Sequence, residues 1–258
     1  MPVIPLNSAN DSRLEPYRHV KDRDLTGRQG LFMAEGKVVL ERLFASPLCE
    51  TVSVLTTPAR LEGLSVPDDA PVYIVDQAVM DAVAGFPIHR GYLALGRYAP
   101  PQSLEDILAQ TGRLRVMALS AIANTDNMGG LMRNAAAFGV DAVVLDSACC
   151  DPFYRKAIRV SVGGALVVPH YRLGAGQSLL EVLNTHGLTA YALSPAGDQV
   201  LDQIVPAERS AFLLGAEGPG LRREILDTAI SVQIPMHGGF DSLNVATTSG
   251  IVLYHLCR

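Results

Sequence analysis

Short, nearly unbroken apolar runs alternate with helical segments throughout the second half of this 258-residue sequence. The apolar runs read "LRVMALSAI", "DAVVLD", "ALVVPHY", "LTAYALS", "SAFLLG" and "ISVQIPM". Helical runs lie between them around residues 129–138, 153–161, 176–186 and 221–228, and "SLNVATTSGIVLYHLCR" closes the chain as an apolar helix. Continuous apolar strands separated by helices are typical of a parallel sheet covered on both faces. The sequence therefore predicts an α/β domain over residues 113–258.

The first hundred residues predict a second, smaller α/β domain. Strand patterns read "GLFMAEG", "CETVSVLTT", "APVYIVD" and "RGYLALGRY", and helical patterns read "KVVLERLFAS" and "QAVMDAVAGF". Pro100 and Pro101 then end an element, and Ser103 with two acids in the following turn predicts a new helix start. We expect a domain at 1–100, a linker at 101–112 and the larger domain at 113–258.

Composition limits the class of protein. With 48% hydrophobic and 18% charged residues, the chain is expected to be soluble and globular rather than disordered. No uninterrupted apolar stretch approaches the roughly 20 residues needed to cross a bilayer. The opening "MPVIPLNSANDSRLEPYRHV" has polar residues where a signal peptide has its apolar core. These features predict a cytoplasmic protein.

The four cysteines do not follow a metal-binding or redox pattern. Cys49, Cys149, Cys150 and Cys257 show no C-x-x-C spacing, and the adjacent pair is poorly placed for a disulfide or a structural zinc site. We expect them to be reduced, small apolar residues, and we expect no metal.

The charge balance bears on nucleic-acid binding. A net charge of −5 argues against a protein that binds nucleic acid nonspecifically, because such binding depends on neutralising phosphate charges. The basic residues are nearly all arginine, which binds phosphate with two hydrogen bonds at once. "RLEPYRHVKDRDLTGRQG", residues 13–30, carries five of the Arg and Lys residues. It has two interpretations, a solvated amphipathic helix and turn, or a surface that faces RNA.

Ligands of parallel α/β sheets bind in loops at the carboxyl ends of strands, and three such loops hold polar residues. In the first, Asn127, Gly129 and Gly130 follow a strand and Arg133 lies one turn into the next helix. Small residues let the backbone approach a ligand, and helix amides favour anions. The structural alternative is a glycine-rich turn with a surface arginine.

The second and third loops each have a structural alternative as well. In "FLLGAEGPGLRREIL", Glu217 could orient a substrate hydroxyl or a base, or it could cap the helix expected from Leu221. In "IPMHGGFDSLNVA", Ser242 is the expected helix N-cap, Asn244 lies in the first turn, and His237 is a candidate general base or an ordinary loop histidine. No G-x-S-x-G, Walker A or H-E-x-x-H motif is present.

Together, in this order, the three loops resemble the SpoU (TrmH-like) group of the SPOUT superfamily, which are RNA 2′-O-ribose methyltransferases. The matching residues are Asn127, Gly129, Arg133, Phe138 and Gly139; Leu214, Gly215, Glu217, Gly220 and Leu221; and Ile234, Pro235, Met236, Ser242, Leu243, Asn244 and Val245. The segment 151–166 resembles the family's stretch between the first two motifs, and "ANTD" and "ATTSG" depart from the usual pattern. The resemblance covers residues 113–258.

The resemblance implies a fold, an assembly and a cofactor. The carboxyl-terminal domain would be a parallel-sheet SPOUT domain with a trefoil knot, which could not be deduced from the residues because knots are nearly absent among folds. Residues 1–100, with an "F-x-x-E-G" strand end, resemble a small RNA-recognition domain related to ribosomal proteins. The family also implies a homodimer with the site at the interface and S-adenosylmethionine as methyl donor. The implied cofactor-binding residues are Leu214, Gly215, Ala216, Glu217, Gly218, Ile234, Pro235, Met236, Ser242 and Leu243.

The resemblance further implies methylation of a ribose 2′-hydroxyl in tRNA or rRNA. Family members use the first-motif arginine, here Arg133, to activate the hydroxyl, with Asn127, Glu217, Ser242 and Asn244 as further catalytic residues. Guanidinium is a very poor base at neutral pH, so a charge role, with phosphate binding and alkoxide stabilisation, is preferred over a base role. The alternatives are a catalytically silent RNA-binding protein on the same scaffold and a nucleotide-dependent enzyme with a small-molecule substrate.

Overall fold

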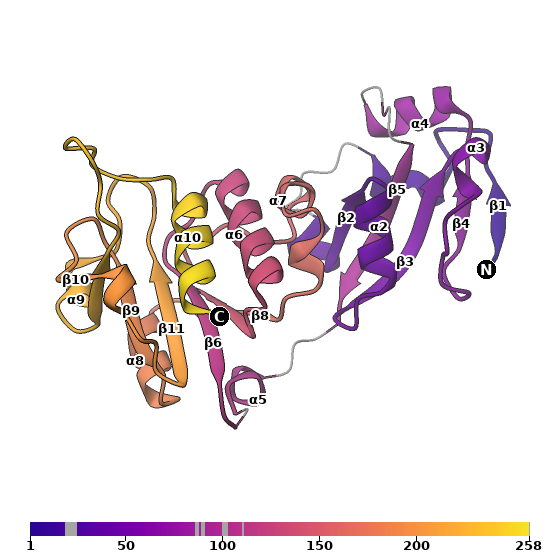
Figure 1. Cartoon of the computed structure of the whole chain (residues 1–258). Coiled ribbons are helices and arrows are strands. Elements are labelled where there is room, and N and C mark those ends of the chain that lie inside the picture. Colours follow the sequence, from indigo (N-terminus) through magenta and orange to yellow (C-terminus); the bar gives the residue numbers. More distant parts are fainter. Residues whose placement is uncertain (19–24, 86–87, 89–90, 100–102, 110, 258) are drawn as a thin grey trace. The chain divides into compact units, whose positions relative to one another are not determined.

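The computed structural model describes residues 1–18, 25–85, 88, 91–99, 103–109 and 111–257, and the chain forms two compact units (Figure 1). The first unit comprises Met1–Pro100 and Pro152–Val167, and the second comprises Pro101–Asp151 and Val168–Arg258. The segment 152–167, which the sequence pattern placed within the larger domain, therefore packs with the first unit.

The first unit is built on a five-stranded mixed sheet with the order β1-β4-β3-β5-β2. The pairs β1–β4 and β4–β3 are parallel, whereas β3–β5 and β5–β2 are antiparallel. The strands are β1 (Val3–Pro5), β2 (Leu31–Glu35), β3 (Cys49–Thr56), β4 (Val72–Ile74) and β5 (Tyr92–Tyr98). The helices and helical turns are η1 (Ser12–Tyr17), η2 (Leu25–Gln29), α2 (Lys37–Phe44), α3 (Pro58–Leu61), α4 (Gln77–Ala84), α7 (Arg155–Val160) and η3 (Gly164–Leu166).

Residues 152–167 cover strand β2, which lies at one edge of this sheet. The ring of Phe153 stacks on Phe32 of β2, with centroids 4.8 Å apart and ring planes 8° from parallel. Arg155 donates two hydrogen bonds, of 3.0 and 2.9 Å, to one carboxylate oxygen of the buried Glu35. A buried carboxylate needs such a partner, because it has lost its hydration. The segment therefore provides an apolar contact for Phe32 and a charged partner for Glu35, both on β2.

Replacing Arg155 with alanine is expected to lower the free energy of unfolding of the first unit by about 3 kcal/mol, because the buried Glu35 carboxylate loses its main hydrogen-bond donor. The matched control is Arg97→Ala. Arg97 pairs with Glu50 at 3.3 Å, but both side chains are about half exposed (50% and 59%), so its loss should cost less than about 1 kcal/mol. Hydrogen–deuterium exchange of the β2 amides at increasing urea concentrations measures the free energy of unfolding in both variants. Equal, small losses would contradict the role given to Arg155.

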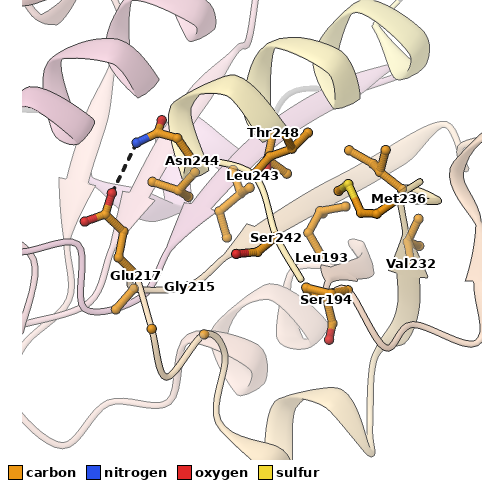
Figure 2. A pocket seen from close by; sticks show the side chains of 17 residues that line it. Leu193, Ser194, Gly215, Glu217, Val232, Met236, Ser242, Leu243, Asn244 and Thr248 are labelled. Atoms are coloured by element: carbon orange, nitrogen blue, oxygen red, sulfur yellow. Dashed lines mark hydrogen bonds between the residues drawn. The ribbon is translucent and has the colours of Figure 1, made fainter. Parts of the chain in front are cut away.

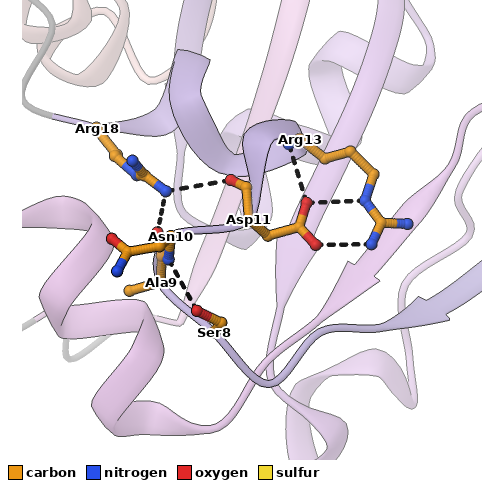
Figure 3. A network of polar contacts seen from close by, with 6 residues as sticks. All are labelled: Ser8, Ala9, Asn10, Asp11, Arg13 and Arg18. Atoms are coloured by element: carbon orange, nitrogen blue, oxygen red, sulfur yellow. Dashed lines mark hydrogen bonds and ion pairs between the residues drawn. The ribbon is translucent and has the colours of Figure 1, made fainter.

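The basic stretch at residues 13–30 is only partly within the described residues. Arg13 donates hydrogen bonds of 2.9 and 2.7 Å to Asp11, and Arg18 donates to the carbonyl oxygens of Ala9 and Asp11 (Figure 3). The hydrogen bonds from Arg13 lower the pKa of Asp11 to about 2. These two arginines therefore serve local structure around η1, while residues 19–24 lie outside the described residues and an RNA contact by the stretch stays a prediction.

The second unit is a seven-stranded sheet with the order β10-β12-β9-β11-β6-β7-β8, and every strand pair in it is parallel. The predicted parallel α/β architecture is confirmed. The strands are β6 (Leu114–Leu119), β7 (Ala142–Leu145), β8 (His170–Arg172), β9 (Thr189–Leu193), β10 (Gln199–Val200), β11 (Arg209–Leu214) and β12 (Ile230–Gln233). The helices are α5 (Leu104–Leu108), α6 (Thr125–Phe138), α8 (Leu179–Thr185), η4 (Leu201–Gln203), α9 (Arg223–Leu226) and α10 (Val245–Leu256).

Helices cover both faces of this sheet because most residues of its central strands are apolar and buried. Leu104 of α5, Leu183 of α8 and Ile225 of α9 share one core with alternate strand residues such as Val116 and Leu213. Helices α6 and α10 pack against each other side by side (Figure 1). Their contact is close enough that a Cβ at Gly130 would lie 2.6 Å from the Cβ of Ala246. Gly130 is therefore required by the close packing of these two helices, and a ligand near it stays a prediction.

Two predicted elements differ in the structure. "ALVVPHY" was expected as a strand from residue 165, but the chain forms the helical turn η3 there and β8 begins only at His170. Gly163 adopts a left-handed conformation (φ +79°), which stops the preceding helix and starts this turn, and Pro169 has no N–H for a ladder. The helix expected over 221–228 is shorter, Arg223–Leu226.

An arginine anchors the closing helix to the centre of the sheet. Arg115, buried on β6, donates hydrogen bonds to the carbonyl oxygens of Leu256, Ala207 and Glu208 at 3.2, 2.9 and 2.7 Å. These contacts fix the end of α10 and the residues before β11 to strand β6. The loops at the opposite end of the sheet therefore extend from strands whose positions are set. Within the described residues, no helix is long and apolar enough to cross a membrane.

Candidate active site

A cavity of about 300 Å³ opens at the carboxyl ends of three adjacent strands, β11, β9 and β12. Its walls come from the residues after each of these strands and from the start of α10 (Figure 2). The lining residues are Leu193, Ser194, Pro195, Leu214, Gly215, Ala216, Glu217, Gly218, Gly220, Val232, Ile234, Met236, Ser242, Leu243, Asn244, Val245 and Thr248. The wall is mostly apolar with a few hydroxyl, amide and carboxylate groups, which is the usual character of a small-molecule site.

The loop after β11 folds back on itself and shapes one wall. The N–H of Gly220 donates to the carbonyl oxygen of Ala216 at 3.0 Å, and the two residues form an isolated antiparallel bridge. A Cβ at Gly215 would lie 2.4 Å from the carbonyl carbon of Gly220 and from the N atom of Leu221. Gly215 is therefore required by the approach of two backbone segments. Gly218 and Gly220 have φ of +82° and +68°, where glycine is favoured.

The loop after β12 leads into α10, and its cap differs from the prediction. The side-chain oxygen of Asn244 accepts from the N–H groups of Ala246 and Thr247 at 2.9 and 3.3 Å, so Asn244 is the N-cap. The expectation that Ser242 caps this helix is wrong. Ser242 instead lines the cavity two residues earlier, where its hydroxyl is exposed.

Three side chains from distant parts of the chain are joined by hydrogen bonds beside the cavity, which Glu217 and Asn244 line and Asn127 does not. Asn127 of α6 donates a hydrogen bond to Oε1 of Glu217, and the Asn244 amide donates to Oδ1 of Asn127 at 2.8 Å and to Oε1 of Glu217 at 3.1 Å. Figure 2 shows the contact between Glu217 and Asn244. We call these residues the polar triad. Glu217 does not cap α9, whose N-cap is Arg222, so the capping interpretation of Glu217 is wrong.

The start of α6 holds Asn127 in position. The helix begins at Thr125, with Asn124 as its N-cap, so Asn127 and Gly129 lie inside the first turns of the helix rather than before it. The preceding turn is fixed by Asp146 after β7, whose carboxylate accepts from the Ser120 hydroxyl at 2.8 Å and from the Ala121 N–H at 3.0 Å. Burial raises the pKa of Asp146, but these hydrogen bonds outweigh it and hold the pKa below its ordinary value.

Arg133 is not among the residues that line the cavity. It lies six residues beyond Asn127 on α6, which corresponds to about 9 Å along the helix axis. Its side chain is exposed, and it makes no hydrogen bond or ion pair with the residues that the structure describes. The structure therefore joins Asn127 to Glu217 and Asn244, which line the cavity together with Ser242, and leaves the Arg133 side chain exposed.

The cavity also contains residues that the sequence patterns did not single out. Ser194 follows strand β9, and the rule that ligands bind at the carboxyl ends of parallel strands could have identified it. Thr248 lies one helical turn after Asn244 on α10, which places both on one side of the helix. Of the residues expected to bind cofactor, Pro235 does not line the cavity. His237 is exposed in the adjoining loop and does not line it either.

The cysteines are unpaired thiols in this structure. Cys149 is buried, and burial raises its pKa to about 12, while the pKa of Cys150 and of Cys49 is raised to about 11. Thiols with raised pKa values are poor nucleophiles and metal ligands at neutral pH. Within the described ranges of the chain, no group of three or more His, Cys, Asp or Glu side chains is arranged to hold a metal ion.

Relatives of known sequence resemble the chain over nearly its whole length. The profile of the SpoU rRNA methylase family matches residues 114–254. An uncharacterised tRNA/rRNA methyltransferase of Mycobacterium bovis is 38% identical over 96% of this chain and 90% of its own length. The 23S rRNA (guanosine(2553)-2′-O)-methyltransferase RlmP of Bacillus subtilis is 24% identical over 97% of this chain and 98% of its own length.

Solved structures share the fold. An AdoMet-bound rRNA methyltransferase from Sinorhizobium meliloti has a TM-score of 0.84 with 23% identity, and the match covers 98% of this chain and 97% of that one. The AviRb methyltransferase of Streptomyces viridochromogenes, in complex with AdoMet, has a TM-score of 0.79 with 17% identity over 96% of this chain and 98% of its own. From the profile match and the Mycobacterium relative, the chain belongs to the SpoU rRNA methylase family and is an RNA methyltransferase.

Proposed function

We propose that this enzyme transfers a methyl group from S-adenosylmethionine to a ribose 2′-hydroxyl in tRNA or rRNA. The observation that carries the proposal is the polar triad of Asn127, Glu217 and Asn244, two of whose members line the strand-end cavity. The names of relatives support it, since RlmP of Bacillus subtilis and RlmB of Vibrio parahaemolyticus, which is 32% identical over 66% of this chain, are guanosine 2′-O-methyltransferases.

The cavity suits S-adenosylmethionine, which supplies a methyl group on a sulfonium that is already a good leaving group. Leu193, Val232 and Ile234 offer apolar surface for a flat base. Ser194 and Thr248 offer hydroxyls, and the loop of Gly215 and Gly218 offers backbone groups that no side chain covers. The proposed cofactor-binding residues are Leu214, Gly215, Ala216, Glu217, Gly218, Ile234, Met236, Ser242 and Leu243, with Pro235 as a neighbour in the same loop.

In this proposal Arg133 activates the ribose through its charge. The protein must align the hydroxyl with the methyl group and stabilise the alkoxide that develops as the proton leaves. A guanidinium stays protonated at all physiological pH values, so it is suited to binding the neighbouring phosphate and to stabilising negative charge, and unsuited to accepting a proton. The exposure of Arg133, without a protein partner in the described ranges, leaves its hydrogen-bond donors available for RNA.

The polar triad would position the ribose. Replacing Glu217 with alanine removes the acceptor that holds both Asn127 and Asn244, and kcat is expected to fall about 10- to 100-fold, less than for Arg133→Ala, because it disturbs alignment and leaves the charge. Single-turnover transfer of labelled methyl to RNA measures the rate. The control is Glu224→Ala, an exposed acid on α9. A loss equal to or larger than that of Arg133→Ala would reverse this ranking.

The remaining family expectations belong to the same proposal. We infer a trefoil knot in the second unit, supported by the path of residues 234–244, which leave β12 and reach α10 past the ends of β9 and β11. We infer that the first unit is a ribosomal-protein-like RNA-recognition domain.

A homodimer with the site at its interface is supported by Ile251 and Tyr254, apolar residues that are 40% and 52% exposed on α10. A cytoplasmic location stays a prediction.

A direct test combines binding with product analysis. Calorimetry should show that the purified enzyme binds S-adenosylmethionine, and incubation with RNA from a strain lacking the gene should yield 2′-O-methylated nucleosides after digestion. Cofactor binding without any methyl transfer would instead favour the catalytically silent RNA-binding alternative.

A further inference from the structure

The loop between β12 and α10 displays two exposed rings, one on each side of a tight turn. Phe240 is 66% exposed, although a phenylalanine normally buries its ring, and His237 is exposed as well. The N–H of Phe240 faces the carbonyl oxygen of His237 at 3.4 Å. Between them Gly238 and Gly239 have φ of +68° and +75°, the sign that a type I′ turn requires at both of its central residues.

This turn geometry brings the two residues close together. In a four-residue turn the Cα atoms of the first and last residues lie within about 7 Å. A flat base between two rings needs about 3.5 Å on each side. The spacing set by Gly238 and Gly239 is therefore compatible with one base between His237 and Phe240. A Cβ added at either glycine would meet no atom within 4 Å, so the turn's sequence reflects its φ angles and not crowding.

The turn adjoins the cavity directly. Met236 immediately precedes it and Ser242 follows two residues after it, and both line the cavity (Figure 2). Recognition of RNA commonly targets single-stranded loops, whose unstacked bases are bound on Phe, Tyr, Trp and His rings. An exposed aromatic pair beside the cavity supplies such a surface.

We propose that His237 and Phe240 form a stacking clamp for the base of the target nucleotide, or of its immediate neighbour, while the ribose lies at the polar triad. The proposal rests on the 2′-O-methyltransferase function proposed above and assigns this loop a role in RNA binding. The contacts involve ring faces, which every base possesses, so the clamp holds a nucleotide without selecting its identity. His237 thereby acts in positioning and not as the general base considered from the sequence.

Tryptophan fluorescence tests the clamp directly, because the chain contains no tryptophan. Phe240→Trp keeps a ring at the turn and places the single indole there. Titrating this variant, with S-adenosylmethionine present, with RNA from a strain lacking the gene should quench the indole emission. The matched control is Val205→Trp, at an 89% exposed site before the amino end of β11, away from the strand ends that form the cavity; its emission should not change.

Kinetics supply a second readout. Phe240→Ala should raise KM for RNA about 5- to 140-fold, the range expected for losing one base–aromatic stack. Phe240→Tyr should restore it, His237→Ala should give a smaller rise, and the Kd for S-adenosylmethionine should not change in any of them. Equal quenching of both tryptophan variants, or an unchanged KM in Phe240→Ala, would overturn the clamp while 2′-O-methylation by the wild type upholds the proposed function.

Sedimentation tests whether a second copy of the chain, and not an RNA base, covers this surface. If Phe240→Ala lowers the sedimenting mass, the ring belongs to a subunit interface and the clamp is wrong. If the wild type forms no 2′-O-methylated product at all, the proposed function fails, and the clamp fails with it.

Discussion

Arg133→Ala is expected to lower the rate of methyl transfer about a thousand-fold while the Kd for S-adenosylmethionine stays at its wild-type value. The size follows from the loss of one charged donor to a developing oxyanion, taking the cost of about 10²- to 10³-fold for one oxyanion donor in other enzymes, and from the additional loss of a phosphate contact. Cofactor affinity should be preserved because Arg133 does not line the cavity and its side chain is exposed on α6. Single-turnover kinetics and calorimetry measure the two quantities separately.

The matched control for Arg133 is Arg223→Ala in the same unit. Arg223 is also exposed, and it pairs with Asp227 four residues later at 3.0 Å, an interaction of little energetic weight. This variant should retain wild-type transfer. Turnover close to wild type in Arg133→Ala would remove Arg133 from the mechanism, and a parallel loss of cofactor binding would mean that the residue supports the fold of the site.

Gly215→Ala is expected to abolish binding of S-adenosylmethionine, with at least about a hundred-fold rise in Kd. The new Cβ would lie 2.4 Å from backbone atoms of Gly220 and Leu221, and backbone cannot move aside as a flexible side chain can. The loop that closes one wall of the cavity would have to open, which separates Glu217 from Asn127 and Asn244. Calorimetric titration of the cofactor provides the measurement.

A second glycine in the same loop is the control. A Cβ at Gly218 would meet no atom within 4 Å, although its φ of +82° makes alanine unfavourable by about 1–2 kcal/mol. Gly218→Ala should therefore weaken cofactor binding modestly and keep the cavity. If the two variants lose affinity equally, crowding at Gly215 does not decide the shape of this wall.

The sequence predicted the parallel sheet because its signal is local. Strands such as β6 and β11 are mostly apolar, and this pattern follows from burial on both faces, whichever elements cover them. The loops at their carboxyl ends could be identified in the same way, since the position of ligands follows from the sheet. The three motifs together indicated the family, whereas each single loop also had a purely structural interpretation.

What could not be predicted depends on contacts between distant segments. Ser242 and Asn244 are both good cap residues, and only the observed start of α10 shows that Asn244 is the cap and Ser242 faces the cavity. The interaction of Glu217 with Asn127 spans 90 residues and has no local signature. Gly130 lies beside the motif residue Gly129 on α6, but it is small because of Ala246, a residue on another helix.

The segment 152–167 shows the same limit at the level of domains. Its helix was predicted from its own residues, but its partners, Phe32 and Glu35, lie over a hundred residues earlier. A boundary drawn where a linker-like composition occurs assumes that each domain is one continuous stretch. Here the chain leaves the second unit after Asp151, contributes to the first, and returns at Val168.

Mapping of ribose methylation is the measurement that bears most directly on the proposed function. RNA from a strain lacking the gene is incubated with the purified enzyme and S-adenosylmethionine, and 2′-O-methylated positions are located by their resistance to alkaline cleavage, with the Arg133→Ala variant in parallel. We predict that wild-type enzyme restores methylation at a defined ribose in tRNA or rRNA and that the variant does not. Methyl transfer to a base instead of a ribose, or equal restoration by the variant, would contradict the mechanism proposed for this site.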